Sequence, residues 1–345
     1  MSTKMLSILI PPIHGYLCNA YPLSIALQNS NSEAWFLSNY IQVVCAGNFP
    51  EGKFFTFYNS YFEWDSIFLG CPFINYQKIH YQLIKKYNGE LISFICDAIE
   101  KNNYVYLYVD EYYISHKSAF NKYSLPHEML IFGYNRTEST FNVLGYDANT
   151  VFGKYEVSFD ELTIAYQMCD KSTKNREYLY LLESNEDFNY QFDTQLVIQT
   201  LREYRYSINT SLHFRAINPP NDWWIYGMAA YTHFVKYIRS MMESLEGVID
   251  IRIFHTLWEH KRMMVLRINY IQKRNILINS DDILKQYTYI QDSSLILMRM
   301  VMKYNLINDK KTLEKIEKKI LEIESLETQA LDNLIKRLES RDCPH

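Results

Sequence analysis

The spacing of apolar residues along the chain changes near residue 190. Before that point apolar residues form short, dense runs. The clearest is YVYLYV at 104–109, whose aromatic and β-branched residues are typical of a strand. After that point apolar residues recur every three or four positions over long stretches, as they do in helices. The pattern therefore predicts an α+β domain over 1–185 and an all-helical domain over 190–345.

The helical spacing of the second domain predicts a bundle of long helices. Turns rich in Asn, Asp and Ser separate the segments. The last segment is so rich in apolar residues that one of its faces must pack on a core or on a partner, while its charges form a solvated face. The predicted helices are 193–209, 223–246, 250–273, 280–305 and 309–340.

The first domain is predicted to contain two antiparallel strands, at 129–134 and 140–146, because the short turn NRTES joins them. His127 precedes one strand and Asp147 ends the other, so both residues are expected at the same end of the sheet. The other expected elements are a strand at 5–10, a helix at 19–29 with Pro22 in its first turn, a helix-like segment at 75–87, a short strand and a helix within 89–101, a helix at 158–167 and a strand at 178–182.

Composition narrows the class of protein. The 345 residues are 48% hydrophobic and 16% aromatic, which excludes a disordered chain, and the net charge of -4 gives no general attraction to nucleic acid or to an anionic membrane. No stretch approaches the roughly 20 apolar residues of a membrane span, and the start does not resemble a signal peptide. Six cysteines without a CxxC pair favour a cytoplasmic protein with reduced thiols.

The candidate chemistry centres on Cys18, where a polar turn leads into the predicted helix at 19–29. The first N–H groups of a helix lower the pKa of a thiol and can bind an oxyanion. Such a cysteine needs a base, and the base needs an orienting group. We therefore predict a catalytic triad of Cys18, His127 and Asp147. The alternative is that Cys18 is a small buried hydrophobe and that the other two residues are structural.

Several short motifs resemble the papain-like, C39-peptidase-like cysteine family, and more closely its branch from antibiotic biosynthesis typified by the butirosin acyltransferase. In the first domain they are CNA at Cys18, VYLYVDEYYI around Asp110, PHEMLIFGYN with His127 and GYD ending at Asp147. YGMAAYTHFVKYI at 226–238 resembles the C-terminal domain of that branch. The resemblance implies a papain-like cysteine-protease fold for the first domain and a helical second domain.

The same resemblance implies amide-bond formation rather than proteolysis. An acyl or peptidyl group would pass from a thioester on a carrier protein, through Cys18, to a small amine such as a diamine or an aminoglycoside, in nonribosomal peptide or antibiotic biosynthesis. His127 would take the thiol proton and Asp147 would fix the imidazole tautomer. The chain itself would bind no cofactor, because the phosphopantetheine belongs to the partner carrier protein.

One departure from the family concerns the oxyanion hole. Papain-like peptidases usually place a glutamine six residues before the cysteine, and this chain has Pro12 there, which cannot donate a hydrogen bond. The backbone N–H of Cys18 would then act with another donor, for which His14, Tyr16 and Asn19 are candidates. A thioester needs less help at its oxyanion than an amide does, so this departure favours acyl transfer over peptidase activity.

Two further residues are candidates for binding substrate. Asp110 and Tyr113 follow the strand at 104–109, where they could bind the ammonium group of an acceptor and an aromatic acyl group. Asp110 is equally consistent with a turn former at the end of that strand. We predict no metal site, because His255 and His260 are five residues apart and do not share a helix face as an i, i+4 pair would.

Two other functions remain open from the sequence. A cysteine hydrolase, either a peptidase or a thioesterase, would release the same acyl group to water. A non-catalytic protein of papain-like fold would hold a carrier protein or a metabolite, and the missing glutamine at position 12 supports this alternative. The sequence leaves the oligomeric state undecided, with a homodimer as one option, and it does not identify the acyl donor or the acceptor.

Overall fold

The computed structural model divides the chain into two compact units. It describes residues 2–49, 51, 54–59, 67–86, 91–173, 176–216, 218–244 and 247–342. Unit 1 consists of Met1–Ser32 with Glu63–Asn189, and unit 2 consists of Glu33–Phe62 with Tyr190–His345. The division after Asn189 coincides with the predicted boundary, but the segment 33–62, which we assigned to the first domain, groups with the helices of unit 2.

Unit 1 is built on an antiparallel sheet in which the strands follow the order β4-β9-β5-β6-β7-β8, with β1 also paired to β6. Strands β5, β6, β7 and β8 follow one another along both the chain and the sheet, whereas β9 returns to pair with β5 and β4. The strands are β1 (Thr3–Met5), β4 (Ile74–His80), β5 (Tyr104–Asp110), β6 (Pro126–Asn135), β7 (Thr140–Tyr146), β8 (Phe152–Ser158) and β9 (Tyr178–Ser184).

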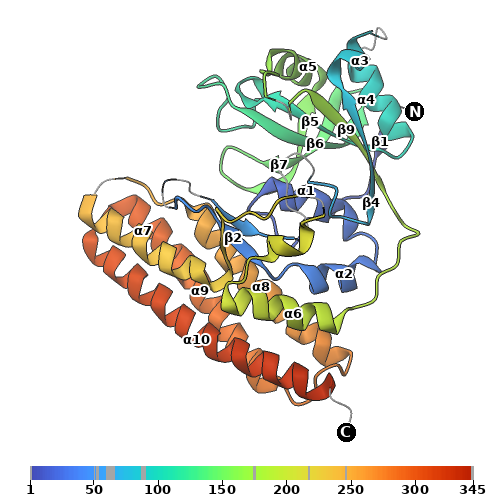
Figure 1. Cartoon of the computed structure of the whole chain (residues 1–345). Coiled ribbons are helices and arrows are strands. Elements are labelled where there is room, and N and C mark those ends of the chain that lie inside the picture. Colours follow the sequence, from blue (N-terminus) through green and yellow to red (C-terminus); the bar gives the residue numbers. More distant parts are fainter. Residues whose placement is uncertain are drawn as a thin grey trace. The chain divides into compact units, whose positions relative to one another are not determined.

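The helices of unit 1 are α1 (Leu17–Ala26), α3 (Tyr81–Lys86), α4 (Leu91–Glu100) and α5 (Phe159–Met168), with a 3-10 turn η2 (Glu111–Tyr113) after β5 (Figure 1). Helix α5 begins with a capping box, because the Ser158 side chain accepts from the N–H of Glu161 and the Glu161 carboxylate accepts from the N–H of Ser158. Apolar residues of α4 and α5 pack on the sheet and form one core with it.

The two faces of the sheet are occupied by different elements. Side chains alternate along a strand, and Met129 and Ile131 of β6 belong to the core formed with α4 and α5. The opposite face of the sheet meets α1, because the Tyr21 ring lies 6.0 Å from the Tyr106 ring, and Tyr106 pairs with Leu130 in the ladder. Alternate residues of one strand therefore point to two different environments.

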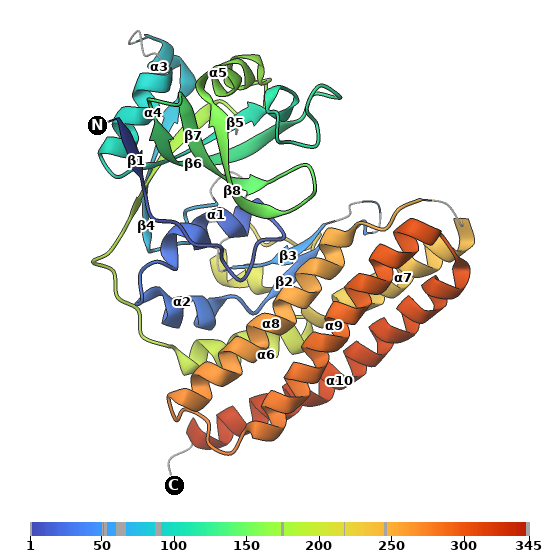
Figure 2. The ribbon, with the colours of Figure 1, turned by 180° about the vertical axis from the view of Figure 1, so that it is seen from behind.

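Unit 2 combines a bundle of helices with a small sheet (Figure 2). Helix α9 packs against α8 and α10, and α10 also contacts α6 and α7. The helices are α2 (Ser32–Asn39), α6 (Thr194–Tyr206), α7 (Ala230–Ser244), α8 (Ile251–Lys273), α9 (Asp281–Ile307) and α10 (Lys310–Asp342), with 3-10 turns η3 (Thr210–Phe214) and η4 (Gly227–Ala229). The small sheet has the order β10-β2-β3, with β2 (Val43–Cys45), β3 (Phe55–Phe57) and β10 (Ile225–Tyr226).

A buried arginine explains why the segment 33–62 belongs to unit 2. The guanidinium of Arg267, on α8, donates to the carbonyl oxygens of Leu37 and Tyr40, both at 2.7 Å. A buried guanidinium must find such acceptors, so α8 is bound to the end of α2 through groups that the hydrophobic pattern does not show. The second domain is consequently not all-helical, because β2 and β3 come from this segment.

Most of the strongly patterned elements are confirmed. The strands predicted at 104–109, 129–134, 140–146 and 178–182 and the helix at 158–167 are present, and each of the five helices predicted after 190 has a counterpart. The helix-like segment at 75–87 is instead a strand followed by a short helix. The strand expected at 5–10 is wrong except at Met5, because the chain forms β1 at Thr3–Met5 and residues 6–10 are not in a strand. Residues 91–100 are helical without a preceding strand among the described residues. Across the described ranges, each helix is too short or too polar to cross a membrane.

Candidate active site

Cys18 is the second residue of α1, and Tyr16 is the N-cap of that helix. The carbonyl of Tyr16 accepts hydrogen bonds from the N–H groups of Asn19 and Ala20, at 3.1 and 3.0 Å. The helix begins two residues earlier than predicted, so Pro22 lies in its second turn and not in its first. Because proline has no N–H, Pro22 cannot donate the usual helical bond to the carbonyl of Cys18.

The surroundings of the Cys18 thiol favour its protonated form. Burial is the largest effect and raises the pKa of the thiol, and the negative charge of Glu128 raises it further. The backbone N–H groups of Asn19 and Cys18 lower the pKa, as the start of a helix does, but they do not compensate. The thiol is therefore not ionised at neutral pH, and a base must take its proton before it can act as a nucleophile.

His127 lies near the start of β6 and contacts two carboxylates. Its buried Nδ1 atom lies 3.4 Å from Glu111 Oε1, and its Nε2 atom lies 3.8 Å from Glu128 Oε2. Burial acts to lower the pKa of His127, but the contact with Glu111 and the charges of Glu128 and Glu111 outweigh it and raise the pKa above its usual value. The His127 side chain is 38% exposed, so part of the ring is accessible to solvent.

The alternation of side chains separates Cys18 from His127. His127 shares the face of Met129, which packs toward α4 and α5, whereas Glu128 points to the face that meets α1. Consistent with this, Glu128 is the side chain whose charge acts on the Cys18 thiol. In the part of the chain that the structure describes, no hydrogen bond links Cys18 to His127. The predicted nucleophile is on α1, the predicted base is on β6, and the two are not in contact.

A buried ion pair supports the carboxylate that contacts His127. Lys117 Nζ lies 3.1 Å from Glu111 Oε1, and both side chains are less than 10% exposed. The same ammonium group donates to the carbonyl oxygen of Tyr146 at 2.8 Å. Burial acts to raise the pKa of Glu111, but the contact with His127 and the charge of Lys117 lower it below its usual value. Glu111 is therefore ionised where it meets His127.

Asp147 occupies the predicted place at the end of β7, but it closes its own loop. One carboxylate oxygen accepts from the N–H groups of Asn149 and Val151, at 2.9 and 2.8 Å. The pKa of Asp147 is lowered, chiefly by the bond from Val151. The predicted pairing of Asp147 with His127 is not formed, because the loop uses the carboxylate and Glu111 lies against the imidazole instead.

Asp110 follows the structural alternative and not the substrate-binding one. Its carboxylate accepts from the N–H of Tyr112 at 3.0 Å, the N–H of Leu125 at 2.8 Å and the hydroxyl of Ser124 at 2.6 Å. Burial acts to raise the pKa of Asp110, and these bonds overcome it and lower the pKa. With its oxygens engaged in this way, Asp110 shapes η2. Tyr113, the other candidate, is half-buried and packs against the core.

The candidate oxyanion donors are all near Cys18 in the chain, and they differ in what they contact. Asn19 is buried, and its backbone N–H stabilises the anionic form of the thiol. The carbonyl oxygen of His14 accepts from the Tyr146 hydroxyl at 2.7 Å, and its ring stacks on Phe152 at 5.2 Å. Tyr16 provides the carbonyl that begins α1. Of these three candidates, Asn19 is the one whose backbone N–H acts to lower the pKa of the thiol.

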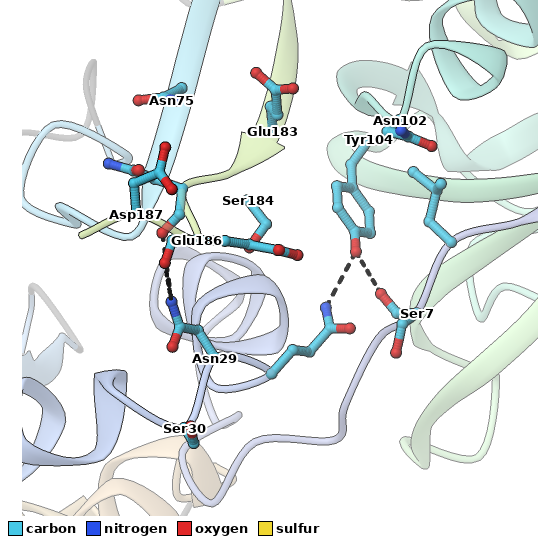
Figure 3. A pocket seen from close by; sticks show the side chains of 13 residues that line it. Ser7, Asn29, Ser30, Asn75, Asn102, Tyr104, Glu183, Ser184, Glu186 and Asp187 are labelled. Atoms are coloured by element: carbon cyan, nitrogen blue, oxygen red, sulfur yellow. Dashed lines mark hydrogen bonds between the residues drawn. The ribbon is translucent and has the colours of Figure 1, made fainter. Parts of the chain in front are cut away.

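A hollow lies at the other end of α1, in unit 1 (Figure 3). It has a volume of about 880 Å³, and the charged residues that line it are Glu183, Glu186 and Asp187, all exposed. Gln28 and Tyr104 are hydrogen-bonded to each other in its wall at 3.1 Å. Cys18 is eight residues before the end of α1, at the opposite end of the helix, so this hollow adds no group to the chemistry of the thiol.

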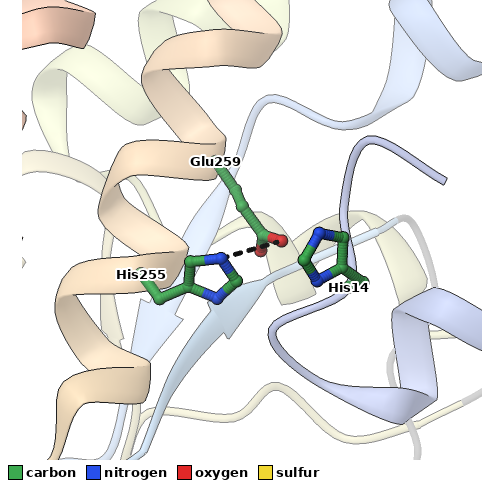
Figure 4. A group of neighbouring side chains, drawn as sticks. All are labelled: His14, His255 and Glu259. Atoms are coloured by element: carbon green, nitrogen blue, oxygen red, sulfur yellow. Dashed lines mark ion pairs between the residues drawn. The ribbon is translucent and has the colours of Figure 1, made fainter. Parts of the chain in front are cut away.

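The histidines of α8 have different surroundings from each other. His255 Nε2 lies 3.9 Å from Glu259 Oε1, one helical turn away (Figure 4). His260 is fully buried, and its Nε2 donates to the carbonyl oxygen of Ile41 at 2.7 Å. Burial lowers the pKa of His260, so its ring is neutral. These two histidines bind different partners and do not share a ligand set.

Sequence reasoning missed three charged residues of this region: Glu111, Lys117 and Glu128. Glu128 follows His127 directly in the sequence, but the sequence does not predict to which face of the sheet its side chain points. Glu111 follows Asp110 directly, and its role depends on the turn that Asp110 forms. Lys117 lies in a loop, where no sequence pattern indicates its role.

A search of protein-family models found none that matches the sequence, and a search of curated proteins found no similar one.

Proposed function

We propose that this chain is a cysteine-dependent acyltransferase with a papain-like first unit, which forms an amide by passing an acyl group from a carrier-protein thioester to a small amine. The observation that carries the proposal is the place of Cys18 near the start of α1, where the N–H groups of Asn19 and Cys18 stabilise a negative charge on sulfur. The antiparallel sheet beside α1, with a histidine at the start of β6, supports the same class.

The reaction has two acyl transfers. In the first, the sulfur of Cys18 attacks the carbonyl carbon of the thioester, and the C–S bond to the phosphopantetheine arm breaks. His127 takes the thiol proton and passes it to the departing thiolate. In the second, the acceptor amine attacks the acyl carbon, the C–S bond to Cys18 breaks, and His127 takes a proton from the amine and passes it to the departing Cys18 sulfur. The products are the amide, the free carrier thiol and the original enzyme.

The first transfer requires the His127 imidazole to approach Cys18. His127 is the second residue of β6, its side chain is 38% exposed, and Nε2, which faces Glu128, is the nitrogen that would receive the proton. Glu128 must turn away or be screened for this to happen, because its charge disfavours the thiolate. Binding of an acyl-carrier thioester beside α1 would supply that displacement.

Intact-protein mass spectrometry tests the proposal directly. The full chain is mixed with carrier proteins that bear simple acyl thioesters, with and without an added diamine. We expect a mass increase of one acyl group, which the diamine discharges faster than water does. In Cys18→Ala the adduct is absent, and in His127→Asn it forms about 10²–10⁴-fold more slowly.

Cys169→Ala is the matched control, because Cys169 is another buried free cysteine of unit 1 and is the C-cap of α5. It should be acylated like the wild type. An adduct that survives in Cys18→Ala, or that is lost in Cys169→Ala, would contradict the assignment of Cys18. Discharge that is equally fast without amine would favour the cysteine hydrolase.

A second candidate function is a non-catalytic protein that holds a carrier protein or a metabolite. The raised pKa of the Cys18 thiol, caused by burial and by Glu128, favours it. Alkylation with iodoacetamide separates the two candidates. If wild type and Cys18→Ala are labelled equally at pH 8 and no carrier transfers its acyl group, the binding function is the better account.

A further inference from the structure

We infer that Glu111, locked by Lys117, is the residue that positions the His127 imidazole, and that Asp147 is not. This inference rests on the proposed function, because it assigns how the base of that reaction is held. It starts from the ion-pair contact between Glu111 Oε1 and the buried Nδ1 of His127, at 3.4 Å, a distance and orientation that do not make a hydrogen bond in this structure. A carboxylate on one ring nitrogen fixes the ring and leaves the other nitrogen for proton transfer.

Glu111 has little freedom to move away from His127. Its carboxylate lies 3.1 Å from Lys117 Nζ, and its backbone N–H donates to the carbonyl oxygen of Leu125 at 3.0 Å. Lys117 is in turn fixed to the carbonyl oxygen of Tyr146 at 2.8 Å. Glu111 is therefore held through both its side chain and its backbone, as a positioning residue must be.

The turn that aims Glu111 is made by its neighbour. Asp110 caps η2 through the N–H of Tyr112 and reaches across to Ser124 and Leu125, so the chain after β5 is tied to the chain before β6. These bonds place Glu111 beside the start of β6, where His127 lies. Asp110 thus contributes to the site through the backbone and not through a substrate contact.

Glu128 and Asp147 are less suited to this role. Glu128 faces the other nitrogen of the ring, at 3.8 Å, and its side chain is 19% exposed against 8% for Glu111. The carboxylate of Asp147 accepts hydrogen bonds from the N–H groups of Asn149 and Val151. The charged groups that face His127 are therefore Glu111 from η2, Lys117 from the following loop and Glu128 from its own strand.

The tautomer of neutral His127 follows from this arrangement. With Glu111 as the acceptor, the proton stays on Nδ1, and Nε2 carries the free electron pair that a base needs. Long-range proton–nitrogen NMR on the wild-type chain labelled at histidine measures this, with His127→Asn identifying the resonances. We expect the Nδ1–H tautomer above the pKa of His127, and the Nε2–H tautomer would overturn the inference.

A pH titration of the His127 NMR signals compares the effects of Glu111 and Asp147 on the pKa of this histidine. In Glu111→Gln the pKa of His127 should fall, since the negative charge that favours the imidazolium is gone, and in Asp147→Asn it should stay as in the wild type. Because Glu111→Gln leaves Lys117 buried without its ion pair, Glu111→Gln/Lys117→Met provides a second variant with no lone charge. The pKa should fall in it as well. A fall in Asp147→Asn, or no change in both Glu111 variants, would overturn the inference.

The two proposals fail separately. If Cys18 is acylated normally while His127 titrates independently of Glu111, the acyltransferase stands and the positioning role is wrong. If Glu111 controls the titration but no acyl group reaches Cys18, the positioning is correct and the proposed reaction is wrong. Glu111→Asp adds a rescue test, because it keeps the charge on a shorter side chain and should recover part of the pKa shift that Glu111→Gln loses.

Discussion

Lys261 Nζ lies 2.5 Å from Glu327 Oε1 in unit 2, and neither side chain has exposed surface. The hydroxyls of Tyr204 and Tyr231 also donate to this carboxylate, at 3.0 and 2.7 Å. Lys261→Met removes one partner and leaves a buried charge, so we expect the free energy of unfolding of unit 2 to fall by about 3–5 kcal/mol. Urea unfolding followed by tryptophan fluorescence measures it, since four of the five tryptophans belong to this unit.

The control for Lys261 is an exposed pair on α10. Lys319 Nζ lies 2.7 Å from Glu322 Oε2, and these side chains are 21% and 39% exposed. Lys319→Met should cost about 0.5 kcal/mol or less, because water screens this pair. Replacing both buried partners, in Lys261→Met/Glu327→Leu, should be milder than Lys261→Met alone. Equal costs for the buried and the exposed lysine would contradict this account.

Removing the charge of Glu128 should make Cys18 more reactive. Burial is the main reason for the raised pKa of the thiol and stays in place, but Glu128→Gln abolishes the second cause. The thiolate fraction at pH 8 then rises, and the rate of alkylation by iodoacetamide rises in proportion. Mass spectrometry of Cys18 over time measures the rate, with Glu183→Gln, an exposed carboxylate of β9, as the control. The same rate in both variants would show that Glu128 does not act on the thiol.

Asp147→Asn should lower the melting temperature at pH 7 and have a smaller effect in acid. The native pKa of Asp147 lies below its unfolded value because the N–H groups of Val151 and Asn149 bind the carboxylate. A lowered native pKa stabilises the protein above the unfolded pKa, and this contribution is lost as the pH falls through the native one. The difference between wild type and variant should therefore shrink near pH 3. A deficit that is unchanged at pH 3 would show that the charge is not responsible.

Strongly patterned elements could be predicted because local sequence decides them. The dense apolar run of β5 and the long amphipathic helices after 190 are examples. Strand β4 was missed because its residues Asn75 to Lys78 are exposed and polar, and because its partner is distant: Ile74 pairs with Ser184, 110 residues further on. No local pattern encodes such a pairing.

The site could be predicted only in part, for a related reason. The place of Cys18 near the start of a helix and that of His127 near the start of a strand follow from local signals. Which carboxylate meets His127 depends on the turn after β5, and that turn is fixed by bonds from Asp110 to Ser124 and Leu125, which lie 14 and 15 residues away. The face to which Glu128 points depends on the exact register of β6. Neither the contact between Glu111 and His127 nor the orientation of Glu128 can be predicted from one sequence alone.

Gly227→Ala should be among the most damaging small substitutions in unit 2. Gly227 has φ +57, and an added Cβ would lie 2.2 Å from the carbonyl oxygen of Tyr204, which is backbone and cannot yield easily. Gly247→Ala is the control, because its φ is +106 but the nearest atom, Met241 Cε, is 3.5 Å away. We expect Gly227→Ala to lose about 1–3 kcal/mol more than Gly247→Ala in urea unfolding. Equal losses would mean that backbone strain alone, and not the contact with Tyr204, requires glycine at this position.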